Sequence, residues 1–386
     1  MNIEEMKRRL LRDIDALKSS EGYLNAGYPR YNTLFGRDSL ISGWQMLEID
    51  PSIARETLRA LAKYQGKKMN ARAEEEPGKI LHEYRFDPEE QAELPHWDFP
   101  YYGSVDSTPL FIILAGKYLK QTGDETFLSK LWDNIVTAYG WIRDYGDLDV
   151  DGYLEYERKN PHGLFHQGWK DGVENHLRIT TPVALVEVQG YLYAAYQSLT
   201  FLTKELGENE ISAAALERSK VLKRNFNVDF WVEEEKYFAL ALDGQKKQKK
   251  VITSNPGHLL FTGIVAQDKT EHVVSRLFKR DLWASYGIRT HSSEDPDFDP
   301  YSYHKGSVWP QDNWIIYKGL KALGFDNHAD RIKNALVRAF GKLGKIPERY
   351  AVVNDRIVDL SQMEGASANP LQAWSSAGSL EMIWED

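Results

Sequence analysis

Apolar residues recur at intervals of three and four along most of this chain, and this is the period of amphipathic α-helices. The pattern predicts twelve helices, at residues 2–18, 38–48, 51–66, 105–121, 124–146, 182–205, 208–224, 254–264, 267–279, 311–324, 325–342 and 371–383. Alternation typical of strands is scarce. The segment KYFALAL (236–242), followed by the turn residues Asp243 and Gly244, is the clearest candidate for a hairpin arm. We therefore expect an all-α fold.

The connections between the predicted helices alternate between short and long. Short connections cover 48–52 and 121–125, and long ones cover 67–104, 147–181, 280–310 and 343–370. Loops this long inside a compact domain are usually functional. They also hold most of the Pro and His residues. A toroid of paired helices would gather all of them at one end, where they would form one cleft. No linker divides the chain, so residues 1–386 are expected to form a single domain.

The composition excludes several classes of partner and site. The net charge of −9 argues against a nucleic acid or an anionic membrane as partner, because both require a basic surface. The chain has no Cys, which excludes disulfides and thiolate metal sites. The charged start MNIEEMKRRLLRDIDALKSS is not a secretory signal, and no apolar run is long enough to span a bilayer. A cytoplasmic location is expected. The lysine-rich GQKKQKK (244–250) is predicted to be a solvated loop rather than a binding patch.

Aromatic residues make up 12% of the chain, with 11 Trp and 21 Tyr. Many lie in polar segments rich in Gly and Pro, such as HWDFPYYGS (96–104), FHQGWKDG (165–172) and SVWPQDNW (307–314). A large aromatic core would instead place them in periodic helices. The positions favour a cleft lined by rings that stack on flat ligand faces.

The loop GLFHQGWKDGVENH (163–176) contains a candidate acid. Asp171 follows Trp169 and Lys170, and an acid beside a bulky ring can be kept protonated by desolvation, as a general acid requires. Glu174 is expected to support Lys170 or a substrate hydroxyl. The competing interpretation of this segment is a surface turn with a partly buried Trp.

Two segments suggest groups that bind the hydroxyls of a ligand. In YNTLFGRDS (31–39), the forked N–H groups of Arg37 can donate hydrogen bonds to neighbouring hydroxyls, and the Asp38 carboxylate can accept hydrogen bonds from them. The alternative is that Asp38 caps the following helix. In FPYYGSVDSTPLF (99–111), Ser104 or Asp106 is a candidate cap, and the two Tyr can face a ligand.

The second half of the chain contains candidates for a base. In GKIPERYAV (344–352), Glu348 follows Pro347 in a short extended run, and the alternative is a salt-bridged surface Glu. LSQMEGASANPLQAWSS (360–376) adds Glu364. Trp309 precedes a proline, so it is expected to be extended and displayed.

Metal and covalent chemistry have weaker support. The acidic residues of 290–313 lack the spacing of a calcium loop, and His82 with Glu83 is more typical of a hydrogen-bonding loop than of a metal half-site. The sequence contains no nucleophile elbow, no phosphate-binding loop and no H-E-x-x-H. We expect no metal and no cofactor.

Seven motifs occur in order, and together they resemble a known family. They are FGRDS, EPGKILHE, YYGSVDSTPLF, QGWKDG, VEVQGYLYAA, YSYHKGSVWPQDN and LQAWSSAG. From about residue 31 to 384 the chain looks like the catalytic domain of amylo-α-1,6-glucosidase-type glycogen-debranching proteins. Related inverting glycosidases include glucoamylases, processing α-glucosidase I and mannosylglycerate or glucosylglycerate hydrolases. The resemblance implies an (α/α)6 barrel of six inner and six outer helices.

The resemblance also implies roles for individual residues. Asp171 is the general acid and Glu348 the general base of an inverting hydrolysis, with carboxyl groups roughly 6.5–9.5 Å apart. Arg37 and Asp38 bind hydroxyls of the non-reducing-end sugar, and Trp169 walls the pocket. The other substrate-binding positions are Phe35, Tyr102, Asp106, Gln167, Lys170, His304, Lys305, Trp309, Gln311 and Trp374. The expected partner is a carbohydrate, namely an oligosaccharide with an α-glucosidic bond.

The sequence departs from the family pattern in two respects. The interval from Glu348 to Trp374 is longer than expected, so Glu364 remains a rival base. The β-rich N-terminal domain of many relatives is not expected here, which favours short oligosaccharides over polymers.

Three alternatives to the debranching activity remain open. A hydrolase of a small glycoside (glucosylglycerate, mannosylglycerate or trehalose) would share the inner pocket. A sugar 2-epimerase would need His166, His304 or His82 as acid and base. A non-catalytic glycan-binding protein would keep the aromatic rings but would need neither carboxylate.

Overall fold

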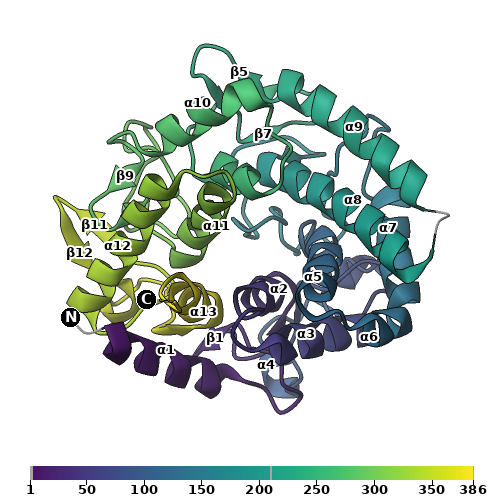
Figure 1. Ribbon diagram of the computed structural model, residues 1–386, viewed down its shortest axis with the longest axis horizontal. Coiled ribbons are helices and arrows are strands. Elements are labelled where there is room, and N and C mark those ends of the chain that lie inside the picture. Colours follow the sequence, from purple (N-terminus) through teal and green to yellow (C-terminus); the bar gives the residue numbers. More distant parts are fainter. Residues whose placement is uncertain (1–2, 209–210, 386) are drawn as a thin grey trace.

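The computed structural model describes residues 3–208 and 211–385, and its helices form a closed double ring (Figure 1). The inner ring consists of α2 (Gly36–Gln45), α5 (Ser107–Thr122), α8 (Val186–Leu206), the 3-10 helix η2 (Asn255–Phe261), α11 (Pro310–Ala322) and α13 (Ala373–Met382). The outer ring consists of α1 (Ile3–Leu17), α3 (Pro51–Lys63), α7 (Trp132–Asp144), α9 (Ser212–Asp229), α10 (Gln267–Leu277) and α12 (Asp326–Leu343). Each inner helix contacts the next, and α13 returns to α2. This is the predicted (α/α)6 barrel.

The two ends of the barrel differ in the length of their connections. Inner helices pass to the next outer helices through short links; α5 and α8, for example, end at Gly123 and Gly207, both in the left-handed conformation that favours glycine. Outer helices lead into inner ones through the long loops 18–35, 64–106, 145–185, 230–254, 278–309 and 344–372. The long loops therefore gather where the inner helices begin, as the alternating connection lengths predicted.

Short antiparallel strands tie the long loops together. They are β1 (Gly27–Tyr28) with β13 (Leu371–Gln372), β2 (Leu34–Phe35) with β3 (Glu83–Tyr84), β4 (Ala184–Leu185) with β7 (Ala241–Leu242), β7 with β8 (Gln248–Lys249), β5 (Trp231–Val232) with β6 (Tyr237–Phe238), β9 (Trp283–Ala284) with β10 (Gly287–Ile288), and β11 (Ala351–Val353) with β12 (Arg356–Val358). The β1–β13 pair joins segments from opposite ends of the sequence. It closes the ring together with the packing of α1 on α13.

The core lies between the two rings, and the helix sequences reflect their positions in it. Outer α1 buries one face through Met6, Leu10, Ile14 and Leu17. Inner α5 is buried over almost its whole length, because it is covered by α2, α8, α3 and α7. An amphipathic outer helix and an almost fully buried inner helix are the two patterns that this double ring requires.

Four predictions about elements need correction. The predicted helix 124–146 is divided at Leu131 into α6 (Glu125–Lys130) and α7; Leu131 leaves the helical conformation with its side chain still buried, so the apolar period continues across the break. The predicted helix 254–264 is the 3-10 helix η2, with Pro256 in its first turn. The loop 67–104 contains the short helices η1 (Ala71–Ala73) and α4 (Pro88–Ala92). The helix predicted at 208–224 is α9, and residues 209–210 lie outside the described ranges.

The hairpin predicted after KYFALAL is confirmed by β7 and β8. The prediction that GQKKQKK is a solvated loop is wrong in part, because Gln248 and Lys249 form β8 and Lys246 makes ion pairs with three carboxylates.

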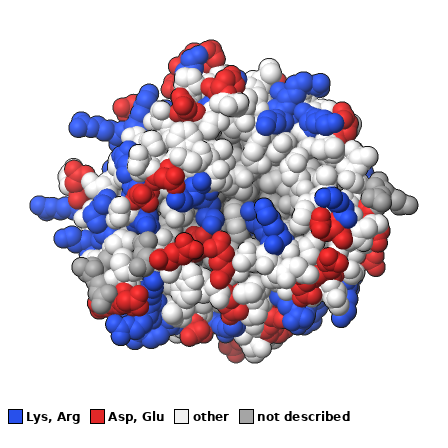
Figure 2. All heavy atoms as spheres, in the orientation of Figure 1, with Lys and Arg blue, Asp and Glu red and all other residues white. Residues whose placement is uncertain are grey.

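Charges of both signs are interspersed over the face of the ring seen in Figure 2. None of the helices within residues 3–208 and 211–385 is long and apolar enough to cross a bilayer.

Gly36 is a position where the barrel should not tolerate a side chain. A Cβ there would lie 2.0 Å from the backbone oxygen of Leu81 and 2.7 Å from the Ser107 hydroxyl. We expect Gly36→Ala to destabilise the protein by about 1–3 kcal/mol through overpacking. Gly140, within α7, is the matched control, because a Cβ there meets nothing within 4 Å. Gly140→Ala should stabilise by up to about 1 kcal/mol. Thermal unfolding of both variants tests this, and equal Tm values would contradict it.

Candidate active site

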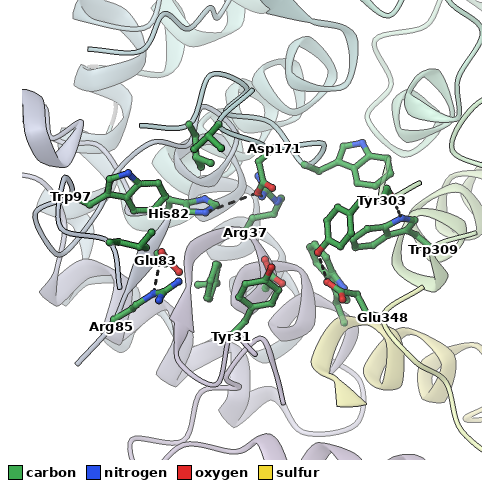
Figure 3. A pocket seen from close by; sticks show the side chains of 17 residues that line it. Tyr31, Arg37, His82, Glu83, Arg85, Trp97, Asp171, Tyr303, Trp309 and Glu348 are labelled. Carbon is green, nitrogen blue, oxygen red and sulfur yellow. Dashed lines mark hydrogen bonds and ion pairs between the residues drawn. The ribbon is translucent and has the colours of Figure 1, made fainter. Parts of the chain in front are cut away.

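A pocket of about 220 Å³ opens among the long loops, at the end of the barrel where the inner helices begin. Arg37 and Asp38 come from the first turn of α2, Trp309 immediately precedes α11, and Trp374 lies in the first turn of α13. Figure 3 shows the lining side chains, with Arg37 and Asp171 on one side of the cavity and Trp309 and Glu348 on the other. The full lining is Tyr31, Phe35, Arg37, Asp38, His82, Glu83, Arg85, Leu94, Trp97, Leu164, Trp169, Asp171, Val173, Tyr303, Trp309, Glu348 and Trp374.

Asp171 is presented by a tight loop, as the breaks in periodicity predicted. The loop is closed where His166 pairs with Gly172 through backbone hydrogen bonds. Trp169 and Lys170 point from it into the protein and are almost fully buried, and the Lys170 ammonium donates to the Thr290 carbonyl at 2.6 Å. The two buried side chains anchor the loop, and Asp171 keeps 26% of its side-chain exposure.

The surroundings of Asp171 favour its protonated form more than water does. Burial raises its pKa to about 6, against the opposing effect of the Arg37 guanidinium. Arg37 donates to Asp171 Oδ2 at 2.5 Å, but its other nitrogen is held by both oxygens of Asp106, at 3.0 and 2.9 Å. Arg37 is thus shared between two carboxylates, so it offsets only part of the cost of burying the Asp171 charge.

Glu348 lies across the pocket from Asp171 (Figure 3). Its Oε1 accepts from the Tyr303 hydroxyl at 2.6 Å and its Oε2 accepts from the backbone N–H of Asn369 at 2.8 Å. Burial raises its pKa, while these two hydrogen bonds act in the opposite direction. A carboxylate has about four lone-pair sites, so Glu348 can still accept a proton from water.

A chain of hydrogen bonds connects Glu348 with Asp38. The Asn369 side chain donates to Gln372 at 2.9 Å, and Gln372 donates to Asp38 Oδ1 at 3.1 Å. Burial raises the pKa of Asp38 to about 8. The N-cap residue of α2 is Phe35, and Asp38 lines the pocket and accepts from Gln372, so its position fits the hydroxyl-binding interpretation better than the capping one.

Glu83 adds a further carboxyl group on the other side of the pocket. Burial raises its pKa to about 7, with Arg85, 3.4 Å away, acting against the shift. His82 lies 4.0 Å from Asp171, and burial lowers its pKa well below the usual value, so its ring is neutral. The pocket therefore offers hydrogen-bond acceptors and donors around two guanidinium groups, Arg37 and Arg85, that are each held by carboxylates.

Aromatic rings form the remaining walls. Trp309 lies edge-on to Trp169 and Trp374, with centroids 5.8 and 6.1 Å apart. At the other side, Trp97 stacks on Tyr101 at 3.7 Å. Rings held at fixed angles around carboxyl groups are suited to a sugar, which presents both apolar faces and hydroxyls.

The structure brings eight of the predicted site residues to the pocket surface: Phe35, Arg37, Asp38, Trp169, Asp171, Trp309, Glu348 and Trp374. Six others are buried outside this lining: Tyr102, Asp106, Gln167, Lys170, His304 and Gln311. Two of these hold pocket residues directly: Asp106 grips Arg37, and the His304 ring hydrogen-bonds the Asp171 carbonyl.

Three predicted contacts fall elsewhere. Lys305 pairs with Asp297 at 3.4 Å. Glu364 is exposed in the loop before β13 and does not line the pocket. Glu174 is exposed, and Lys170 is bound by Thr290 instead. Of the two predicted caps of α5, Ser104 is the one that accepts from the backbone of the first turn.

Among the other lining residues, His82 was predicted from the sequence only as an acid or base of an epimerase. The sequence predicted no individual pocket role for Tyr31, Glu83, Arg85, Leu94, Trp97, Leu164, Val173 and Tyr303. Most lie inside or next to motifs already singled out; Tyr31 opens YNTLFGRDS, and Tyr303 precedes His304. The aromatic content of these loops was the available signal, but it did not say which ring faces the ligand.

Comparisons with known proteins agree with this geometry. Residues 31–351 match the profile of the mannosylglycerate hydrolase MGH1-like glycoside hydrolase domain. Mannosylglycerate hydrolase MGH1 of Selaginella moellendorffii is 32% identical over 74 residues, which cover 19% of this chain and only 15% of the plant protein. The plant MGH2 protein matches to the same extent.

Solved structures show the same fold over the whole chain. The GH63 mannosylglycerate hydrolase from Thermus thermophilus, in complex with Tris, superposes with a TM-score of 0.75 at 15% identity, covering 99% of this chain and 100% of the other. Its complex with Tris and D-glycerate gives a TM-score of 0.73 at 16% identity, with the same coverage. At this identity the likeness establishes the fold. The narrower resemblance to debranching enzymes is not confirmed by these matches.

Proposed function

Because this chain belongs to the mannosylglycerate hydrolase MGH1-like glycoside hydrolase family, we propose that it hydrolyses α-linked glycosides with inversion, releasing the sugar at the non-reducing end. The observation that carries the proposal is the pairing of two unlike carboxyl groups in one pocket. Asp171 is held by a shared arginine with its pKa raised to about 6, and Glu348 stands apart from it with two hydrogen-bond donors.

The two carboxyl groups suit different steps of one displacement. Asp171, protonated, donates to the glycosidic oxygen as the bond to the anomeric carbon breaks. Glu348, ionised, takes a proton from the water that attacks this carbon from the opposite face. Arg37 and Asp38 hold hydroxyls of the sugar, and Trp169 and Trp309 confine its ring. No step requires a metal or a cofactor.

The substrate that we propose is a small glycoside with a short polar aglycone, of the glycosylglycerate type. A second cavity, of about 390 Å³, shares Tyr31, Glu83 and Arg85 with the sugar pocket and is otherwise lined by Pro29, Arg30, Asn32, Thr33, Glu90 and Glu93. The polar groups of this cavity suit an aglycone that carries hydroxyls, because Arg30, Asn32 and Thr33 can donate and the three glutamates can accept, with Arg85 paired to Glu83 and Glu93. Family membership supports the same choice. An α-1,6-glucosidic branch, the other candidate, would have to fit the same cavity.

The domain organisation and the cellular location are proposals as well. Residues 1–386 are proposed to form one catalytic domain, because α1 and α13 close the same ring. The cytoplasmic location stays a prediction from the sequence. An epimerase is disfavoured, because of its three candidate histidines His82 lines the pocket but His166 and His304 do not, so the acid–base pair of histidines that it needs is not formed there.

A substrate panel read by NMR tests the proposal. Mannosylglycerate, glucosylglycerate, trehalose, isomaltose, panose, maltotriose and branched limit dextrin are incubated with the enzyme, and the anomer first released is identified. We expect the β-anomer from a glycosylglycerate and far slower release from the glucose oligomers. First release of the α-anomer would contradict inversion. Rapid cleavage of panose or limit dextrin with inert glycosylglycerates would assign the debranching activity instead, and no hydrolysis of any compound would contradict the proposal as a whole.

A further inference from the structure

The loop that follows α7 has the spacing of a calcium-binding loop. In the sequence DLDVDGYLE (147–155), acidic residues occupy the first, third and fifth positions, glycine the sixth and glutamate the ninth. These are the positions from which EF-hand-type loops bind Ca²⁺, with glycine making the sharp turn. The twelfth position, where such loops place a bidentate Glu, is Arg158 here.

The folded loop converges as the spacing predicts. One carboxylate oxygen from each of Asp147, Asp149, Asp151 and Glu155 lies within 4.8 Å of the others. Asp147 accepts from the backbone N–H groups of Asp151 and Gly152, both at 3.0 Å, so its position in the turn is fixed. Among the residues that the structure describes, this is the one group of acidic or histidine side chains with metal-binding geometry, and it is separate from the sugar pocket.

A cation from another part of the chain already lies within this group. The Lys246 ammonium is 2.7 Å from Asp149, 2.6 Å from Asp151 and 2.5 Å from Glu155. It thus gives each of its three protons to a different carboxylate. Lys246 reaches the loop from the turn between β7 and β8, about 90 residues further along the chain.

Glu155 is the second observation that points to a cation. Its side chain is completely buried, yet its Oε2 has no hydrogen-bond partner. A buried carboxylate oxygen without a partner is costly, because the charge has left water without full compensation. The Lys246 ammonium satisfies only the other oxygen, whereas a metal ion could be bound by both oxygens of a carboxylate.

From this geometry we propose that residues 147–155 form a divalent-cation site of the calcium type, in which the Lys246 ammonium takes the place of the ion. The distances from nitrogen to oxygen are close to the roughly 2.3–2.6 Å of Ca²⁺–oxygen bonds, so the carboxylates are already near metal-binding positions. Replacing the lysine by a neutral side chain leaves four carboxylates around an uncompensated space. That arrangement should bind Ca²⁺.

The test compares the thermal stability of the wild type with that of Lys246→Met, which keeps most of the stem and removes the charge. In EDTA, Lys246→Met should unfold roughly 3–8 °C below the wild type, because a buried carboxylate loses its partner. Ca²⁺ at 1 mM should restore at least half of this loss, whereas Mg²⁺ at equal ionic strength restores less. The wild type should not respond to Ca²⁺. Lys247→Met is the matched control, since Lys247 is exposed in the same turn; it should behave like the wild type.

Binding is measured directly by Tb³⁺ luminescence, with Tyr153 in the loop as sensitiser. Lys246→Met should bind one Tb³⁺ that Ca²⁺ displaces, and adding Asp149→Asn and Asp151→Asn should abolish this. The same Ca²⁺ response in Lys246→Met and Lys247→Met would overturn the proposal. So would a wild type that Ca²⁺ stabilises through Asp149, because the ion and not the lysine would then be the occupant.

If Lys246→Met does not accumulate as folded protein, Lys246→Gln is treated in the same way. If neither folds without metal, recovery of folded protein from cells and buffers supplied with Ca²⁺ supports the proposal. Failure of Ca²⁺ to recover it would overturn the proposal.

Discussion

Asp171→Asn should lower kcat by at least about 100-fold on a substrate with an alcohol leaving group, because asparagine cannot protonate the departing oxygen. The substitution keeps the size of the side chain and an oxygen that accepts from Arg37. Substrate binding should therefore change less than kcat does. Steady-state kinetics on the preferred glycoside gives both parameters.

A glycosyl fluoride separates proton donation from mere positioning. Fluoride leaves without a proton from the enzyme, so Asp171→Asn should be far less impaired on the fluoride than on the natural glycoside. The pH profile gives a second test. Since burial raises the pKa of Asp171 to about 6, the acid form is present below that pH, and wild-type kcat/KM should fall as the pH rises through it. The variant should lose this limb, and wild-type activity in Asp171→Asn would refute the assignment.

Glu348→Gln should also lower kcat by at least about 100-fold, because glutamine cannot take the proton of the attacking water. The amide oxygen can accept from the Asn369 N–H while the amide NH2 donates to the Tyr303 hydroxyl, so the pocket should keep its shape. This variant should remain equally impaired on the glycosyl fluoride, since water must still be activated. The contrast with Asp171→Asn is what identifies one residue as the acid and the other as the base.

Glu364→Gln is the control for the base. Glu364 is exposed outside the pocket, so its replacement should change kcat by no more than about twofold. The opposite pattern, with a deep loss in Glu364→Gln and little change in Glu348→Gln, would make Glu364 the base.

The helices of the barrel were predictable from the sequence because each helix must bury an apolar stripe against a neighbour, whereas their arrangement in an (α/α)6 ring was implied by the resemblance to a known family. Apolar residues therefore recur with the period of an α-helix in segments such as α1 and α12. The helix prediction failed where the apolar period continues although the backbone leaves the helical conformation. At Leu131 the side chain stays in the core while the backbone leaves the helix, and no Gly or Pro marks the break.

The candidate site was predictable to the extent that its chemistry is local in sequence. Arg37, Asp38 and Asp171 lie in short motifs whose composition is typical of a loop with fixed polar groups. The pocket roles of Tyr31, Trp97 and Tyr303 were not predictable in the same way, because whether a loop aromatic faces a ligand or the core depends on segments far away in the chain. The same limit applies to Lys246, whose partners lie roughly 90–100 residues earlier.

The hydrogen bonds that join Glu348 to Asp38 through Asn369 and Gln372 bear on how the protein is made. A ribosome makes Asp38 and Asp171 before it makes Glu348, Asn369 and Gln372. The hydrogen bond from Asn369 to Glu348 and the packing of α13 against α2 can form only after those later residues have left the exit tunnel. On the ribosome, the two sides of the pocket therefore come together in one late step.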